Sequence, residues 1–287
     1  MFNIRRCALF SVLALSAYPA LATTIYSENF SGFDGSGFAI NPNTGQLHSE
    51  VFRVTGLSHG DGTFAATYDI GDFARGSSNG GVTTGGVYAF DISNGNGSPN
   101  VALGIQQTSS DLTPGDISLR IINQSSATIH SIDIQFDLFE LNNAGRSSVV
   151  EFEYAMGDEN SYNSLAVFNS NEAADANASW AGVLESISLS SINWAAADPL
   201  FLRWSFDDLA GSGSRDEFAI DNITVVDTSG TNSRAIVLSE PGLIFVTGLA
   251  LLVLSGYSTN RAGVSMRSSR MRRNSAGSLL GLPGSAK

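Results

Sequence analysis

Acidic and amide side chains gather around a short glycine turn in the C-terminal third of the sequence. The turn contains Gly211 and Gly213, and five oxygen-bearing residues flank it: Asp207, Asp208, Asp216, Asp221 and Asn222. Carboxylate and amide oxygens are the hard ligands that Ca²⁺ prefers in proteins. The spacing of an EF-hand loop is absent, so composition alone suggests calcium here, and Ca²⁺ is the one cofactor that the sequence suggests.

Arg215 gives the same segment a second interpretation. Its guanidinium could form a two-pronged ion pair with Asp208 or with Asp221, and the turn would then hold together without a metal ion. The sequence leaves both hypotheses open, an ion-paired turn and a bound Ca²⁺.

Carboxylate pairs are also the residues that a glycosidase uses as acid, base or nucleophile. Glu151 and Glu153, like Asp133 and Asp137, share one face of an alternating strand, and this is the polar face. We therefore expect them on a solvated surface. Two carboxylates on a concave face flanked by Trp180 or Trp194 would instead favour an enzyme.

Other catalytic patterns are missing from the sequence. The histidines His48, His59 and His130 show no HxxH or HExxH spacing, and no Gly-x-Ser-x-Gly elbow is present. The sequence favours a non-enzymatic protein, with a sandwich-fold glycosidase or polysaccharide lyase as the alternative.

The elements that must position these residues are β-strands. Apolar and polar residues alternate with a period of two over 132–138 and 150–156, which predicts strands with one buried face. Helical periodicity is nearly absent between the two ends of the chain. We expect further strands over 117–121, 187–189, 201–206 and 218–226, with the last two brought together at their ends by the glycine turn. The pattern predicts an all-β fold, a two-sheet β-sandwich or jelly roll, over residues 23–228.

Three segments predict connections rather than strands. The stretch from Gly71 to Gly86 is rich in glycine but lacks the lysine and the strand-to-helix context of a phosphate-binding loop. Residues 171–182 predict a short helix or a loop. Residues 229–240 begin with a small, polar stretch up to Arg234, and we expect them to form a linker.

The predicted sandwich is strongly acidic. All 27 Asp and Glu residues lie between Glu28 and Glu240, where only seven basic residues occur, so this region carries a net charge of −20. Such a surface repels nucleic acid and anionic lipid, and it suits solubility, divalent cations or a polyanionic matrix bridged by cations. The one cysteine, Cys7, precedes this region, so we expect no disulfide.

Residues 1–22 predict a secretory signal peptide that forms an N-terminal helix. Arg5 and Arg6 precede an apolar run from Cys7 to Tyr18, and the site Ala20-Leu21-Ala22 fits A-x-A cleavage. We therefore expect export, with the mature chain beginning at Thr23.

Residues 241–260 predict a transmembrane helix. The segment has no charge, and at about 1.5 Å per residue it can cross a hydrocarbon core of about 30 Å. A basic tail, residues 261–287, follows it. The positive-inside rule places this tail in the cytoplasm and the sandwich outside.

The C-terminal pattern resembles the PEP-CTERM sorting tail of Gram-negative bacteria. Its parts are Ser239, Glu240 and Pro241 before the apolar span, and Arg261, Arg270, Arg272 and Arg273 behind it. The resemblance implies an exosortase-like sorting protease as a partner. Ser239 stands in place of the first proline of that motif, and 14 residues follow Arg273. Retention of the inner-membrane anchor and cleavage with transfer to the cell surface or the extracellular space both stay open.

A second resemblance covers roughly Phe30 to Val226. The segments GQLHSEVFRVTGL, GGVYAF, SDLTPGDISLR and GSGSRDEFAIDNI are similar, in this order, to exported bacterial β-sandwich domains of lectin-like architecture. The resemblance implies the fold and export, and it implies binding only by analogy. We expect an anchored or sorted protein of the envelope or biofilm matrix, structural or adhesive, with exopolysaccharide as the candidate partner and no nucleic acid.

Overall fold

The computed structural model describes residues 22–230 of the chain. Ala22 is the first of them and is exposed. The rest of the predicted signal peptide, most of the linker, the predicted membrane span and the basic tail lie outside the described residues, together with Ala20, Ser239, Glu240, Pro241, Arg261, Arg270, Arg272 and Arg273. Within residues 22–230, no helix is long and apolar enough to cross a membrane.

Strands make up nearly all the regular structure of the described residues. They are β1 (Thr23–Glu28), β2 (Phe33–Ala39), β3 (Gly45–His48), β4 (Phe52–Thr55), β5 (Ser77–Ser78), β6 (Gly86–Asp91), β7 (Val101–Gln106), β8 (Gly115–Ile122), β9 (Ile129–Leu141), β10 (Arg146–Met156), β11 (Asn163–Asn169), β12 (Ala181–Trp194), β13 (Pro199–Gly211) and β14 (Glu217–Asp227). A 3₁₀ turn, η1 (Gly71–Phe73), interrupts the glycine-rich connection before β5. The all-β prediction is confirmed for residues 22–230.

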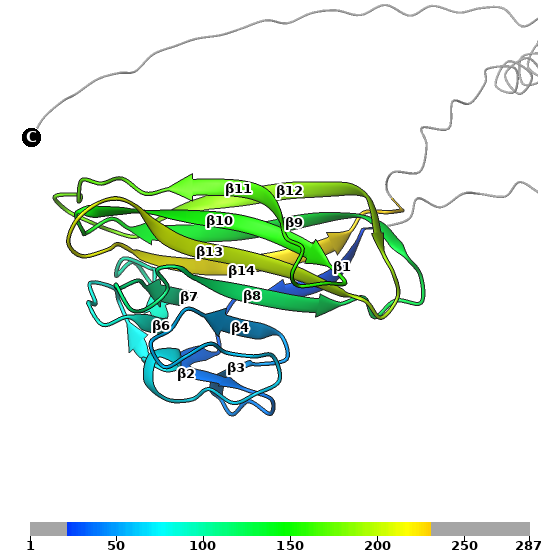
Figure 1. The fold of residues 1–287 in the computed structure, drawn as a ribbon, viewed down its shortest axis with the longest axis horizontal. Helices are drawn as coiled ribbons and strands as arrows, with labels where there is room; N and C mark the ends of the chain where they lie inside the picture. The colour runs from blue at the N-terminus through cyan, green and yellow to red at the C-terminus, as the bar shows by residue number, and fades with distance from the viewer. Residues whose placement is uncertain (1–21, 231–287) are drawn as a thin grey trace, which may run out of the picture. The chain divides into compact units, whose positions relative to one another are not determined.

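Two large sheets face each other (Figure 1). The seven-stranded sheet has the order β12-β9-β14-β7-β6-β5, and β1 also pairs with β14. The five-stranded sheet has the order β11-β10-β13-β8-β4. A small parallel pair, β2 and β3, forms a third sheet that the sequence did not predict.

The core lies between the two large sheets. The rings of Phe136 on β9 and Phe152 on β10 have centroids 4.5 Å apart, and Trp204 on β13 lies 5.2 Å from Phe136. All three side chains are fully buried. The period-2 alternation predicted over 132–138 therefore has its apolar set in the core, where removal from water stabilises the fold.

The outer face of the seven-stranded sheet carries a second apolar cluster. Phe90 stacks on Tyr88 with ring centroids 5.1 Å apart, and Trp180 lies at the same distance on the loop before β12. Because both faces of β6 and β7 are covered, these strands read as continuous apolar runs rather than alternating ones. Gly104 on β7 is required here, because a Cβ at this position would lie 2.1 Å from the Phe90 ring.

Both ends of the described body meet at one place. β1 pairs antiparallel with β14, and Thr23 lies opposite Asp227. Asp227 also lies opposite Ile132 of β9. The strand that ends the described body is therefore hydrogen-bonded on both sides.

The strands predicted over 201–206 and 218–226 are present, and the glycine turn joins them as expected, but they lie in different sheets. β13 belongs to the five-stranded sheet and β14 to the seven-stranded sheet, so the short connection between them crosses from one layer to the other. Their inward residues Phe206 and Phe218 face each other across the core with ring centroids 6.1 Å apart. Alternation fixes which residues point inward, but it does not say which sheet a strand joins.

Two other segments that the sequence predicts as connections are partly strand in the structure. Residues 171–180 contain no helix, so the loop alternative holds there, and Ala181 already begins β12. The glycine-rich stretch from Gly71 to Gly86 is a connection, but it also contains η1 and the two-residue strand β5.

Candidate functional site

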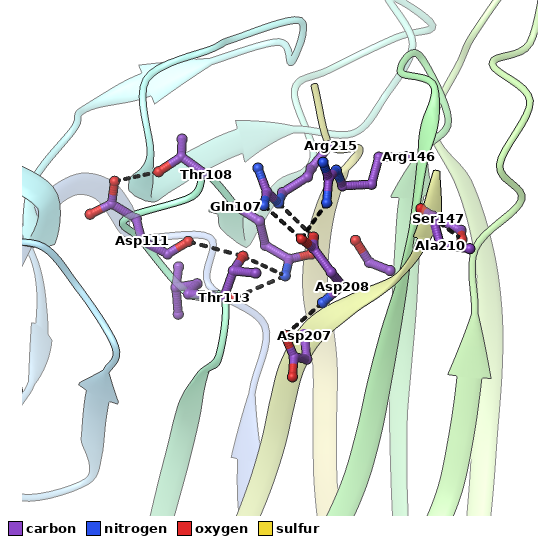
Figure 2. A network of polar contacts seen from close by, with 12 residues as sticks. Gln107, Thr108, Asp111, Thr113, Arg146, Ser147, Asp207, Asp208, Ala210 and Arg215 are labelled. Carbon is purple, nitrogen blue, oxygen red and sulfur yellow. Dashed lines mark hydrogen bonds and ion pairs between the residues drawn. The ribbon is translucent and has the colours of Figure 1, made fainter. Parts of the chain in front are cut away.

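Asp208, in the middle of the acidic segment, forms ion pairs with two arginines. Arg215 donates from Nε to Oδ1 at 2.6 Å and from Nη2 to Oδ2 at 2.7 Å (Figure 2). Arg146 on β10 donates to the same Oδ2 at 2.6 Å. Burial opposes ionisation of Asp208, but the two guanidinium groups outweigh it and lower its pKa. The predicted two-pronged ion pair is present, and Arg146 is a second partner that the sequence did not reveal.

The other predicted calcium ligands face different partners. Asp207 is exposed and accepts a hydrogen bond from the Asp208 amide at 2.8 Å. Asp216 is fully buried and accepts from the Ala144 amide at 2.8 Å. Burial raises its pKa.

Asp221 and Asn222 lie at a bulge in β14, on another part of the seven-stranded sheet. Asp221 is buried and accepts from Asn100 at 3.3 Å, and burial raises its pKa to about 6. Asn222 donates to Asp137 at 2.8 Å. Residues 22–230 contain no group of three or more His, Cys, Asp or Glu side chains placed to hold a metal ion. The structure therefore does not gather Asp207, Asp208, Asp216, Asp221 and Asn222 at one point.

A groove of about 600 Å³ opens on the outer face of the five-stranded sheet. Strands β4, β8, β13 and β10 supply its floor. The polar side chains that line it are Thr55, Asp61, Asp116, Glu151, Arg203, Ser205 and Asp207. Several are cross-strand neighbours, since Ser205 lies opposite both Asp116 and Glu151. One face of adjacent strands thus concentrates hydrogen-bonding groups in a single open cleft.

Arg203 is fixed in the groove from two sides. It donates to Glu153 from Nε at 2.7 Å and from Nη2 at 2.8 Å. Its guanidinium carbon lies 3.6 Å from the centre of the Tyr162 ring. Burial opposes ionisation of Glu153, but the hydrogen bonds from Arg203 and Ser205 outweigh it and lower its pKa. Glu153 is only 8% exposed, so the expectation that it lies on a solvated face is wrong.

Asp116 is oriented by its neighbours in the same way. Thr55 donates to it at 2.6 Å and Ser118 at 2.8 Å. By contrast, Glu151 and Asp207 form no ion pair with any described residue. The groove thus combines held polar groups with two carboxylates that remain available to a ligand.

The two tryptophans considered for an enzyme site do not line this groove. Trp180 is 6% exposed and donates to the Asn79 carbonyl at 3.0 Å. Trp194 is 1% exposed and donates to the Asp198 carbonyl at 2.8 Å. Trp180 borders a separate cleft of about 430 Å³, and another cleft, of about 710 Å³, lies beside β1 and β8.

A buried carboxylate that the sequence did not single out organises the connection between β4 and β5. Asp72 accepts from the His59 amide at 3.0 Å and contacts His59 Nδ1 at 2.6 Å, and Ser58 and Arg75 also donate to it. Burial opposes ionisation, but these contacts outweigh it and lower the pKa of Asp72 to about 2. Arg75 already balances the charge, so the set pins the loop to the body.

No protein-family model and no curated protein sequence matches this chain. Solved structures show a distant likeness. The CBM22-2 xylan-binding domain of Paenibacillus barcinonensis Xyn10C is 12% identical, with a TM-score of 0.37 over 71% of this chain and 99% of that one. The CBM22-1 domain of the same protein is 10% identical, with a TM-score of 0.36 over 74% and 98%.

The enzymatically active domain of the bacteriophage CBA120 tailspike protein 4 is also 10% identical, with a TM-score of 0.29 over 48% of this chain and 17% of that one. Binding modules and an enzyme domain thus both share this distant likeness, which assigns neither function to the chain.

Proposed function

We propose that the protein is a non-enzymatic, exported protein of the envelope or matrix that binds polysaccharide in the groove of the five-stranded sheet. The observation that carries the proposal is the set of fixed polar groups in this open cleft. Arg203 is held by Glu153, and Asp116 is held by Thr55 and Ser118. Side chains already held in place lose little further entropy when a ligand binds.

The chemistry of the groove suits sugar hydroxyls. A hydroxyl both donates and accepts, and adjacent hydroxyls match the forked geometry of a guanidinium or a carboxylate. Arg203 offers donors, and Glu151, Asp207 and Asp116 offer acceptors on neighbouring strands. The acidic body disfavours nucleic acid, so the candidate ligand is a neutral or cation-bridged exopolysaccharide.

The enzyme alternative, a glycosidase or a polysaccharide lyase, has less support. A general acid needs a carboxyl group that stays protonated near neutral pH. Burial raises the pKa of Glu140 and Glu217 to about 7 and that of Asp221 to about 6, and none of the three lines the groove. This distribution favours binding over hydrolysis.

The proposed function also requires that the protein is exported and sorted through its two terminal segments. The signal pattern of residues 1–22, the uncharged span 241–260 and the arginine cluster behind it support an inner-membrane precursor with its sandwich outside. An exosortase-like protease acting near Ser239-Glu240-Pro241 would then transfer the body to the surface. The intact mass of protein from the envelope tests this step, because cleavage removes the basic tail and simple anchoring retains it.

Binding is tested with full-length protein and a panel of neutral, acidic and amino-sugar polysaccharides. Glu151→Gln with Asp207→Asn keeps the shape of the groove and removes two acceptor charges. We expect at least a tenfold loss of affinity, about 1.4 kcal/mol. The matched control is Glu172→Gln, an exposed acid outside the groove.

If the double variant and the control bind polysaccharide with equal affinity, the binding site is not this groove. Release of reducing ends or unsaturated sugars by the unmodified protein, lost on Glu151→Gln, would favour the enzyme.

A further inference from the structure

Each large sheet ends in a strand with only one neighbour. β12 ends the seven-stranded sheet beside β9, and β11 ends the five-stranded sheet beside β10. Phe136 of β9 packs against Phe152 of β10 at 4.5 Å and against Phe168 of β11 at 6.4 Å. The two open edges therefore lie on the same side of the sandwich, along its upper margin in Figure 1.

The β12 edge is long and regular. Its pairing with β9 runs without a register shift from Ala181 to Ser190. The backbone N–H and C=O groups on its other side have no strand partner within residues 22–230. Ten residues of extended chain span about 34 Å, and another β-strand satisfies such a row of groups best.

Lysine and proline, two of the usual protections against pairing, are missing from both edges, and β12 has no bulge from Ala181 to Ser190. The pairing of β11 has one register shift, and Glu185 of β12 lies opposite Phe136. Natural proteins blunt an open edge with lysine, proline, bulges or inward charges. β11 and β12 contain no lysine, arginine or proline, and Glu185 is the one charged residue in their 21 positions. They also carry Val167, Val183 and Leu184, at 56%, 54% and 64% exposure, which are three of the seven exposed large apolar residues in the described body.

The net charge of the described body bears on which partner could pair with these open edges. Two molecules with a net charge of −20 repel each other over most of their surface. The strands β11 and β12 carry one charge in their 21 positions, so this margin adds little local repulsion between two copies. An antiparallel strand pair is also self-complementary, because each copy offers the same row of groups about a two-fold axis.

We propose that β12 pairs antiparallel with β12 of a second copy, joining the two seven-stranded sheets into one continuous sheet. A register centred on Ser186 uses the regular stretch from Gly182 to Ser190 in full. It places Val183 opposite Leu189 and Glu185 opposite Ile187 of the partner subunit. A closed two-fold pair covers both β12 edges, so it gives a dimer rather than a fibre.

Sedimentation velocity of full-length protein in mild detergent tests the proposal. Val183→Glu with Leu184→Glu places carboxylates opposite Leu189 and Ser188 of the partner subunit. Pairing would desolvate these charges without a partner, and we expect the dimer to weaken at least tenfold. Ile70→Glu with Leu209→Glu is the matched control, because both residues are exposed apolar positions off these edges and the charge change is the same. A chain that stays monomeric at 100 micromolar, or a dimer weakened equally by both pairs, would overturn the proposal.

Cysteine cross-linking tests the register and separates this contact from association through other parts of the chain. In a Cys7→Ser background, Ser186→Cys should form a covalent dimer under mild oxidation, since the two positions meet at the axis. Ile70→Cys, also exposed, should not. Equal cross-linking at both positions would contradict the proposed pairing.

Discussion

The guanidinium of Arg203 lies 3.6 Å from the centre of the Tyr162 ring while it donates two hydrogen bonds to Glu153. One cation thus ties a loop aromatic to the floor of the groove. Both contacts use the planar shape of the guanidinium, which a lysine cannot reproduce.

Removing one partner of this pair should cost more than removing both. Arg203→Leu leaves the carboxylate of Glu153 without its partner, and we expect a loss of about 2 kcal/mol in the free energy of unfolding. Adding Glu153→Leu should recover part of that loss, because no buried charge remains. Urea unfolding of the single and double variants measures this, and simple additivity would show that the pair contributes little.

Stability should fall between about pH 4.5 and pH 7 because of two buried glutamates. Burial raises the pKa of Glu140 and Glu217 to about 7 in the folded protein. Their protonated forms favour folding, so this contribution is full at low pH and is lost as pH rises toward the folded pKa. Melting temperatures at pH 5 and pH 8, at matched ionic strength, check the sign.

Glu140→Gln with Glu217→Gln should flatten this pH dependence, since neither amide titrates. Below pH 4 the trend reverses, because Asp72, Asp208 and Glu153 have lowered pKa values and lose their favourable contacts on protonation. A wild-type protein that melts higher at pH 8 than at pH 5 would contradict the assignment.

Asp208 should tolerate the loss of one arginine better than the loss of both. Arg215→Ala leaves Arg146 in place, and Arg146→Ala leaves the two-pronged contact with Arg215. We expect about 1 kcal/mol for each single change and more than their sum for the double variant. Chemical denaturation of the three variants measures the coupling, and a purely additive result would rule it out.

Calcium should leave the melting temperature unchanged. Ligand binding to the folded state alone would add about 2.7 kcal/mol at a hundred times Kd, but the predicted oxygen ligands face separate partners. Thermal unfolding of the full chain with millimolar Ca²⁺ and with chelator, at matched ionic strength, decides this. A raised midpoint with Ca²⁺ would show that the ligands rearrange around the ion.

Gly104→Ala should destabilise the protein by about 1 to 3 kcal/mol, the usual cost of overpacking a core. A Cβ there would lie 2.1 Å from the Phe90 ring, whereas a Cβ at Gly32 would meet nothing within 4 Å. Gly32→Ala is therefore the matched control. Equal melting temperatures for the two variants would show that the ring moves aside freely.

The sequence predicted the fold class because Ile132, Ile134 and Phe136 alternate with polar residues, and all three are buried as expected. It could not predict that β13 and β14 join different sheets, because alternation is the same in either arrangement. The burial of Glu153 could not be predicted for a related reason. Its position on a polar face was correct, but a loop that carries Tyr162 and an arginine from β13 cover it.

The site was harder to predict than the fold. Thr55, Asp116, Glu151 and Ser205 become neighbours only through cross-strand pairing between segments far apart in the sequence. The acidic residues from Asp207 to Asn222 are close together in the sequence. The chain nevertheless passes from one sheet to the other between Asp208 and Asp216, which separates them in space. Clustering along the chain is a poor guide where the chain crosses between layers.

The pairing at the end of β14 also determines how the body would bear mechanical load. A force applied at Asp227 pulls along β14, while the hydrogen bonds to β1 and β9 run across the direction of pull. Such a geometry loads many bonds in shear at once instead of opening them one after another. If the body is held at this end, β14 would bear the drag of a bound polysaccharide, and its hydrogen bonds to β1 and β9 would resist that force together.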